Sequence, residues 1–236
     1  MPNENHNRGA WNKLSGANCP WSIPVSSDEI SAAARGQFQL TLAGPRPVPM
    51  SWLGDRADCN VLCLASGGGQ QAPLLAAAGY NVTLLDISDE QLAIDAEVCA
   101  RYNLDVRIEQ GSMTDLSRFD AGAFQMIVNP VSIPYVEDVQ VVWHECARVL
   151  AASGRLLVGS INPLNYLFEE NEGKDNTGLE VLYSLPFVES ETLTPDELQA
   201  AISREMVFTW SHSLEDICQG QIDAGFLLAG LHESRR

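Results

Sequence analysis

The chain has 236 residues and a formal net charge of −17 at pH 7, with 31 Asp and Glu residues against 14 Lys and Arg residues. This length allows one large domain with a full core, and no apolar stretch approaches the ~20 residues that a membrane span needs. Because nucleic-acid binding draws much of its affinity from cationic contacts with phosphate, the charge argues against an RNA or DNA partner and favours a small molecule.

The six cysteines are scattered along the chain, without a close pair at metal-ligand spacing. Reduced and mostly buried thiols are therefore expected, with no metal site and no disulfide. Residues 1–6 lack the basic and apolar regions of a signal peptide, which favours a cytoplasmic location. The oligomeric state stays open at this stage.

Residues 1–54 precede the first clear strand pattern and contain two short predicted elements. Ser26 and Glu29 form a capping box, which predicts a helix from about Ser27 to Arg35. The three prolines within residues 45–49 force an extended strap that leads toward the sheet.

The most informative stretch begins at Asn60, where an apolar strand runs into three consecutive glycines, residues 67–69. Glycines at such a turn let backbone N–H groups and a helix N-terminus approach a ligand closely. The next apolar run ends in Asp86, 17 positions after Gly69, a spacing that suits a carboxylate gripping a ribose. The pattern predicts a nucleotide-type cofactor site at the carboxyl edge of a parallel sheet.

From this point short apolar runs alternate with helical patterns, which predicts right-handed crossovers and a doubly wound sheet. Ser88 caps the helix after the second strand, and Thr194 opens a late helix that has proline at its first position. Residues 226–231 are predicted to form the last strand. Two further apolar stretches, 179–187 and 206–210, are able to pair as a hairpin, and residues 169–176 read as an acidic loop.

Two cofactor classes compete for the glycine turn. Gly67, Gly69 and Ala72 nominally fit the dinucleotide fingerprint, which is a weak signal by itself. The small residue Ala65, however, already begins the turn. The segment resembles motif I of the class I S-adenosylmethionine (SAM) dependent methyltransferases, with Ala65, Gly67 and Gly69 at the three usual glycine positions. It departs from that motif in Ala65 itself and in Cys63, where an acidic residue is frequent.

Further segments are similar to the same family in the same order. Residues 108–116 look like the segment after the third strand, which cups the adenine; an acidic residue is common where Ser112 stands, and Met113 offers a soft apolar wall. Residues 124–130 resemble the fourth strand, and residues 144–158 resemble the helix, glycine turn and fifth strand that follow. The resemblance covers about residues 55–162 well and the tail from His212 to His232 more loosely.

The resemblance implies a fold, a domain division and a set of contacts. The fold is a Rossmann-like α/β doubly wound sheet of seven strands, with helices on both faces and an antiparallel last strand. Residues 1–54 would form an N-terminal lid and strap, and residues 55–236 the SAM-binding domain with a substrate-cap insertion at about 164–211. The implied cofactor contacts are Trp11, Ala65, Ser66, Gly67, Gly69, Gln70, Asp86, Ile87, Gln91, Ser112, Met113 and Asn129. The implied substrate contacts are Trp21, Pro130, Ser132, Tyr135 and His212.

The implied activity is transfer of a methyl group from SAM to an O, N, S or C atom of a small molecule, leaving S-adenosylhomocysteine. Methyl transfer needs alignment of the reacting atoms, and it needs a general base only when the acceptor is protonated. Tyr135 and His212 are the candidate catalytic residues, and His144 is a weaker candidate base. Two alternatives remain: a SAM-binding regulatory protein without turnover, and a nicotinamide-dependent oxidoreductase, for which no Tyr-x-x-x-Lys constellation is present.

Overall fold

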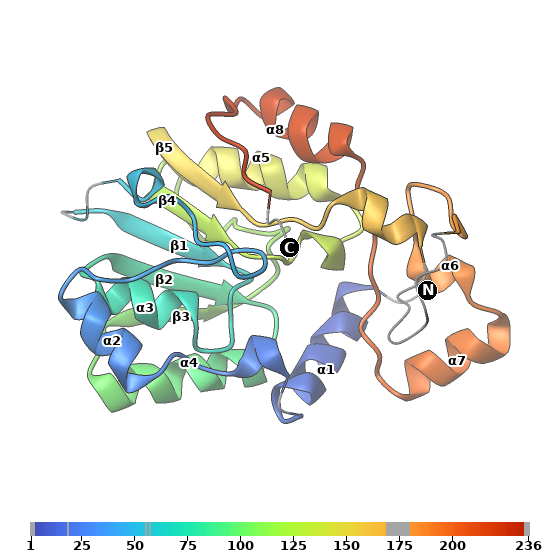
Figure 1. Cartoon of the computed structure of the whole chain (residues 1–236), viewed down its shortest axis with the longest axis horizontal. Coiled ribbons are helices and arrows are strands. Elements are labelled where there is room, and N and C mark those ends of the chain that lie inside the picture. The colour runs from blue at the N-terminus through green and yellow to red at the C-terminus, as the bar shows by residue number, and fades with distance from the viewer. Residues whose placement is uncertain (1–2, 18, 55, 57, 169–179, 234–236) are drawn as a thin grey trace.

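The computed structural model describes residues 3–17, 19–54, 56, 58–168 and 180–233. At its centre is a five-stranded sheet in the order β3-β2-β1-β4-β5, and every neighbouring pair is parallel (Figure 1). The strands are β1 (Asn60–Leu64), β2 (Asn81–Asp86), β3 (Val106–Gln110), β4 (Phe124–Asn129) and β5 (Leu150–Val158).

The central strand is apolar on both faces because both faces are covered. In β1, Val61 and Cys63 belong to one buried cluster, while Leu62 and Leu64 belong to a second cluster on the opposite side. All four side chains are fully buried. A parallel sheet packed on two sides requires such a continuous apolar run.

Helices form a layer on each side of the sheet, as the sequence predicts. Figure 1 shows α5 (Val139–Val149) and α8 (Gly220–Asp223) over one face, and α2 (Ser27–Ala34), α3 (Gln71–Ala77) and α4 (Asp89–Tyr102) over the other. None of the helices in the described part of the chain is long and apolar enough to cross a membrane.

Three predicted helix starts are confirmed by their caps. The Ser26 hydroxyl accepts the N–H of Glu29, and the Glu29 carboxylate accepts the N–H of Ser26, which completes the capping box of α2. The same reciprocal pair at Thr194 and Glu197 opens α7 (Pro195–Ser203). The Ser88 hydroxyl accepts an N–H at the start of α4. Local hydrogen bonds of this kind depend on neighbouring residues only, so sequence spacing predicts them well.

Helix α1 (Glu4–Ser15) lies beside the carboxyl ends of the strands, between the sheet and the pair α6 (Glu189–Thr192) and α7 (Figure 1). The region around α6 and α7 has a small core of its own, in which Ala201, Phe208 and Trp210 are buried. The carboxyl edge of the sheet, α1 and the α6–α7 region are therefore neighbours in the fold.

The predicted sheet of seven strands with an antiparallel last strand differs from the structure, whose described residues form five parallel strands. Residues 226–231 form no strand, and Leu227 and Leu231 are 91% and 83% exposed. This segment packs on Trp52 instead: the ring of His232 lies 4.7 Å from the Trp52 ring, and Gly230 lies so close that a Cβ there would meet the indole at 2.4 Å. An apolar run alone does not specify a sheet partner.

The predicted hairpin is reduced to one antiparallel bridge between Val188 and Trp210, extended by hydrogen bonds from Glu189 N to Thr209 O and from Ser211 N to Phe187 O. Residue 179 of that predicted hairpin and the predicted acidic loop, residues 169–176, lie outside the described residues.

Candidate active site

The glycine turn after β1 follows a left-handed path. Ala65 has φ 48°, and Gly68 and Gly69 have φ 114° and 76°. The Ala65 N–H donates to Leu85 O at 2.7 Å, which ties the start of the turn to β2. Alanine thus adopts, at the first of the three motif positions, a backbone conformation that glycine reaches more easily.

Two carboxylates hold the N–H groups of this turn. Gly67 N–H donates to Asp86 Oδ2 at 2.8 Å, and the N–H groups of Gly68 and Gly69 donate to Asp95 Oδ2 at 2.8 and 2.9 Å. Asp95 lies on α4 and is fully buried. The amides that would cradle a diphosphate are therefore occupied by acidic side chains of the protein itself, which disfavours a dinucleotide and favours a cationic ligand.

Burial raises the pKa of both carboxyl groups. For Asp95 it raises the pKa to about 7, although the N–H groups of Gly69 and Gly68 lower it, and the charge of Asp86 raises it further. For Asp86 burial raises the pKa, while hydrogen bonds from Ser88 and Gly67 lower it. A positive charge near this turn would stabilise the ionised forms.

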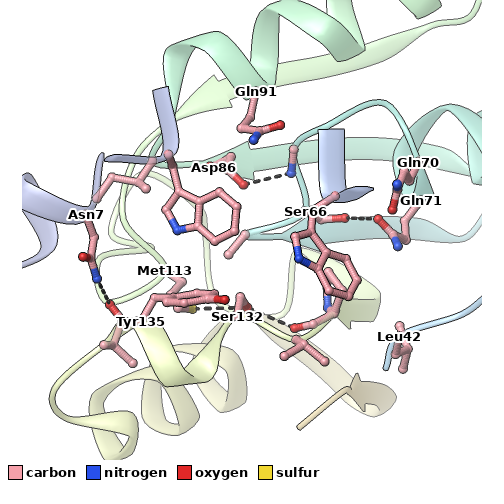
Figure 2. Close-up of a pocket in the computed structure, with 18 of the residues that line it drawn as sticks. Asn7, Leu42, Ser66, Gln70, Gln71, Asp86, Gln91, Met113, Ser132 and Tyr135 are labelled. Carbon is pink, nitrogen blue, oxygen red and sulfur yellow. Dashed lines mark hydrogen bonds between the residues drawn. The ribbon is translucent and has the colours of Figure 1, made fainter. Parts of the chain in front are cut away.

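A cavity opens above the turn and is bounded by segments from the whole chain. In Figure 2, Asp86 and Gln91 lie on one side of it, and Met113, Ser132 and Tyr135 lie on the opposite side. The lining residues are Glu4, Asn7, Trp11, Trp21, Thr41, Leu42, Ala43, Gly44, Ala65, Ser66, Gly67, Gln70, Gln71, Asp86, Ile87, Gln91, Ser112, Met113, Pro130, Val131, Ser132, Tyr135, Val136 and Ile161.

The polar wall of the cavity has an acceptor that is free to bind a ligand. Gln91 Nε2 donates to Ser22 Oγ at 2.8 Å, while Gln91 Oε1 is buried without a hydrogen-bond partner among the described residues. A buried amide oxygen without a donor is costly, so a donor group on a bound ligand would stabilise the site. Two acceptors, the Asp86 carboxylate and the Gln91 amide oxygen, thus face the hydroxyl and amine donors that a nucleoside would bring.

The far end of the cavity is formed by the tip of β4 and the turn after it. Tyr135 closes a short 3-10 turn, Ile133–Tyr135, and its ring meets the Trp11 ring edge-on at 5.1 Å between centroids. Burial raises the pKa of Tyr135 to about 12. The phenol therefore stays protonated at neutral pH, in the form that can donate a hydrogen bond.

Helix α1 closes the cavity and binds the cap segment, residues 180–211. Asn7 Nδ2 donates to Phe208 O at 2.9 Å, and Phe208 N–H donates to Asn7 Oδ1 at 2.9 Å. At the other side of the helix, Ser88 Oγ donates to Asn12 Oδ1 at 2.7 Å. The helix is therefore fastened both to the cap segment and to the start of α4.

A second cover crosses the glycine turn directly. The cover segment, residues 19–25, pairs Val25 N–H with Gly69 O at 2.9 Å, and Gln70 Nε2 donates to Ile23 O at 2.9 Å. Any Cβ at Gly68 would lie 2.2 Å from Trp21 O. Only glycine lets the cover segment approach the turn this closely.

Comparison with known proteins identifies the family. A model described as a methyltransferase domain matches residues 62–158. The uncharacterized methyltransferase YbaJ of Bacillus subtilis (strain 168) is 39% identical over 230 residues, covering 98% of this chain and 90% of that protein. The chain belongs to the methyltransferase family. It is a class I SAM-dependent methyltransferase, and the likeness to the Bacillus protein extends over α1 and the cap segment as well as the sheet.

More distant relatives agree with this assignment. A ubiquinone biosynthesis O-methyltransferase of Caulobacter sp. (strain K31) is 27% identical over 155 residues, covering 63% of this methyltransferase and 59% of the relative. A SAM-dependent methyltransferase structure from Mesorhizobium loti superposes with a TM-score of 0.59 at 16% identity, covering 74% of this chain and 77% of that one. A putative SAM-dependent methyltransferase from Listeria monocytogenes gives a TM-score of 0.57 at 15% identity, covering 73% and 76%. These two structures share the fold.

The structure brings most of the predicted site residues of this methyltransferase to the one cavity. The exceptions are Gly69, Asn129 and His212, which do not line it. Asn129 Nδ2 donates to Leu64 O at 2.9 Å and to Ser132 Oγ at 2.7 Å behind the wall. His212 is buried, with Nε2 2.9 Å from Ile133 O. His144 is exposed on α5, with Nδ1 2.7 Å from Gln140 O.

Sequence reasoning missed several members of the site. Asp95 was detectable, because it is an acid on the buried face of α4 between the apolar residues Leu92 and Val98. Glu4 and Asn7 had no such signal, because a polar helix gives no indication of which distant segment it contacts. The remaining missed lining residues are Thr41, Leu42, Ala43, Gly44, Gln71, Val131, Val136 and Ile161.

Proposed function

We propose that this methyltransferase holds SAM across the turn from Ala65 to Gly69, with the ribose on Asp86, and methylates an uncharged small molecule bound beside Tyr135. The observation that carries the proposal is the single cavity that reaches from Asp86 to Tyr135 and is covered by α1 and the cover segment. When bound, SAM supplies an activated methyl group. The chain itself has to bind both reactants, align them and exclude water.

The cofactor end of the cavity supports SAM over a nicotinamide dinucleotide. Asp86 and Asp95 already occupy the N–H groups of the glycine turn, so a diphosphate would meet two carboxylates. A sulfonium is positively charged and is attracted to the same place. Trp11 and Trp21 also line the cavity, where their rings can make cation–π contacts with the cofactor.

The acceptor end supports an uncharged substrate with an apolar body. Leu42, Val131, Val136 and Ile161 line it. Among the described lining residues, the ionisable side chains are Glu4, Asp86 and Tyr135, and the first two belong to the cofactor end. Burying a charged substrate among these apolar side chains would be costly without a partner charge.

Catalysis in this arrangement rests on positioning. Tyr135 stays protonated, so its hydroxyl can donate a hydrogen bond that orients the acceptor but cannot remove a proton. Holding two reactants in line and free of water can supply about 7–11 kcal/mol of the barrier. The lid contacts of α1 with the cap segment serve this purpose.

Two measurements test the proposal. Titration calorimetry should show S-adenosylhomocysteine binding and no NAD binding at the same concentrations; the reverse would assign the site to a dinucleotide. The purified protein, incubated with SAM and a metabolite extract, should release S-adenosylhomocysteine faster than without extract. Tight binding without any release would identify a SAM-binding regulatory protein.

A further inference from the structure

The cavity has a second carboxylate besides Asp86, and it comes from the lid. Glu4 is the first residue of α1 and lines the cavity. Its Oε2 accepts the Ser112 hydroxyl at 2.8 Å and lies 3.4 Å from Thr114 Oγ1. Its Oε1 has no hydrogen bond to any residue that the structure describes.

Glu4 contacts the segment that follows β3, the strand that pairs with the end of β2 at Asp86. In the β2–β3 pairing Asp86 is opposite Gln110, and Gly111 N–H donates to Asp86 O at 2.9 Å. Ser112, the next residue, is therefore close to Asp86, the residue proposed to bind the ribose. Ile87, which follows Asp86, and Met113, which follows Ser112, both line the cavity. A flat base attached to a ribose on Asp86 would lie against these two side chains and point its edge toward Glu4.

Ser112 cannot receive a base amine by itself. Its hydroxyl donates to Glu4, while its oxygen accepts the Thr114 N–H at 3.0 Å and lies 2.7 Å from Thr114 Oγ1. A hydroxyl has one proton and two lone pairs, so its bonding capacity is used. The carboxylate of Glu4 retains free lone pairs at this end of the cavity.

We infer that Glu4 recognises the adenine of the cofactor, by accepting a hydrogen bond from the exocyclic amine. The inference rests on the proposed function, in which SAM binds with its ribose on Asp86. It places base recognition on the lid helix and not on the sheet. Adenine binding and closure of α1 are then one event, because Asn7 of the same helix binds the cap segment.

The test compares two ligands that differ at one group of the base. S-adenosylhomocysteine carries the amine, and its inosine counterpart carries a carbonyl oxygen, which would face the Glu4 carboxylate unfavourably. Calorimetry should show that the wild-type protein prefers the adenine ligand, and that Glu4→Ala reduces this preference by about tenfold or more, because a hydrogen bond to a charged group is lost. An unchanged ratio of the two dissociation constants in Glu4→Ala would overturn the inference.

A matched control separates base recognition from loosening of the lid. Arg8 lies on the same helix and pairs with Asp89, outside the lining of the cavity. Arg8→Ala should weaken both ligands equally and keep their ratio. If Arg8→Ala lowers the ratio as much as Glu4→Ala does, the preference reports helix docking and the inference fails.

A rescue variant provides an independent readout. Ser112→Asp in the Glu4→Ala background places a carboxylate on the adjacent position, so the preference for adenine should return. Failure of this double variant to regain any preference would count against a carboxylate acceptor at this point. Wild-type protein that binds neither ligand would instead overturn the proposed function itself, so the two failures are distinguishable.

Discussion

Gly68 is the residue at which the cover segment meets the glycine turn after β1. A Cβ at this position would lie 2.2 Å from Trp21 O, whereas a Cβ at Gly79, which also has a positive φ, has no atom within 4 Å. Both Gly→Ala variants should lose about 1–2 kcal/mol of stability to left-handed strain. Only Gly68→Ala should also displace the cover segment and weaken S-adenosylhomocysteine binding. Thermal unfolding and calorimetry on the pair measure this; equal affinities would mean that the cover segment is not part of the site.

Asp86 connects the glycine turn to the start of α4, since it accepts the N–H of Gly67 with Oδ2 and that of Ser88 with Oδ1. Asp86→Asn replaces one acceptor oxygen by a donor and removes the charge. A charged hydrogen bond contributes about 1.5–3 kcal/mol, so S-adenosylhomocysteine affinity should fall roughly 10- to 100-fold. The exposed Asp105 is the control, because Asp105→Asn should bind normally. Normal binding by Asp86→Asn would show that the Asp86 carboxylate does not bind the ligand.

Asp95 makes the stability of the protein depend on pH. An ordinary aspartate titrates near 3.9, whereas burial raises the pKa of Asp95 to about 7. Asp95 is therefore protonated to a larger extent in the folded protein than in the unfolded chain between about pH 4 and pH 7, so its contribution to the free energy of unfolding falls as the pH rises through this window.

The variant Asp95→Asn should flatten this dependence. Its amide oxygen can still accept the N–H groups of Gly68 and Gly69, but it does not titrate. A single proton contributes at most about 1.4 kcal/mol per pH unit, so urea unfolding at pH 5, 6, 7 and 8 resolves the difference in slope. Parallel curves for the two proteins would show that Asp95 is ionised in the fold throughout.

His212 is placed to act on the turn that carries Tyr135. Its Nε2 lies 2.9 Å from Ile133 O, and Trp210 N–H donates to Pro134 O at 2.8 Å. We expect His212→Ala to lower thermal stability, because a buried carbonyl left without its partner costs about 1–3 kcal/mol. Turnover should fall through misplacement of Tyr135, and His212→Gln, which keeps a donor, should recover part of it.

The pH dependence of turnover decides between this positioning role and a general base. If His212 only positions the turn, His212→Ala lowers kcat but leaves the shape of its pH profile unchanged. If His212→Ala instead keeps its stability and changes the shape of the pH profile of kcat, His212 is the base that the family resemblance suggests.

At the scale of elements, the side chains of His6, Asn7 and Lys13 hold α1 to the cap segment. His6 Nε2 lies 2.8 Å from Met206 O, and Lys13 Nζ donates to Arg204 O at 2.7 Å. Asn7 is 2% exposed and makes two hydrogen bonds with the backbone of Phe208. Asn7→Ala should leave that N–H and C=O unpartnered and release residues 206–210, which hydrogen exchange would detect as faster exchange. Asn5 lies on the exposed side of the same helix, and Asn5→Ala is the control. Unchanged exchange in Asn7→Ala would show that residues 206–210 hold their place without the Asn7 hydrogen bonds.

The elements of the sheet were predictable because their signals are local. Strand β1, its glycine turn and Asp86 follow one another within 27 residues, and capping boxes mark α2 and α7. The last strand was not predictable in this way. Residues 226–231 have the apolar character of a strand, but Trp52, far away in the sequence, packs against them. Tertiary contacts decide such weak cases.

For the molecule as a whole, the sequence indicated the layers and the charge, and the family resemblance implied an N-terminal lid, but neither indicated which lid residues contact which distant segments. Asp86 and Met113 belong to motifs whose place on a parallel sheet is set by topology. Glu4 and Asn7 reach the cavity through side-chain contacts with Ser112 and Phe208, separated from them by 108 and 201 positions. No spacing rule covers such distances, so these residues could be found only in the structure.

The long separation between α1 and its partners also orders events during synthesis. At about 5–20 residues per second, residues 206–208 leave the ribosome roughly 10–40 s after α1 does. Over that interval the helix lacks its contacts with Phe208, although its partners Ser88 and Ser112 have already been synthesised. Few of its side chains are apolar: these are Ala10, Trp11 and Leu14, while the rest are polar or small. The helix can therefore settle against the sheet side of the cavity first. Its hydrogen bonds with the cap segment form last.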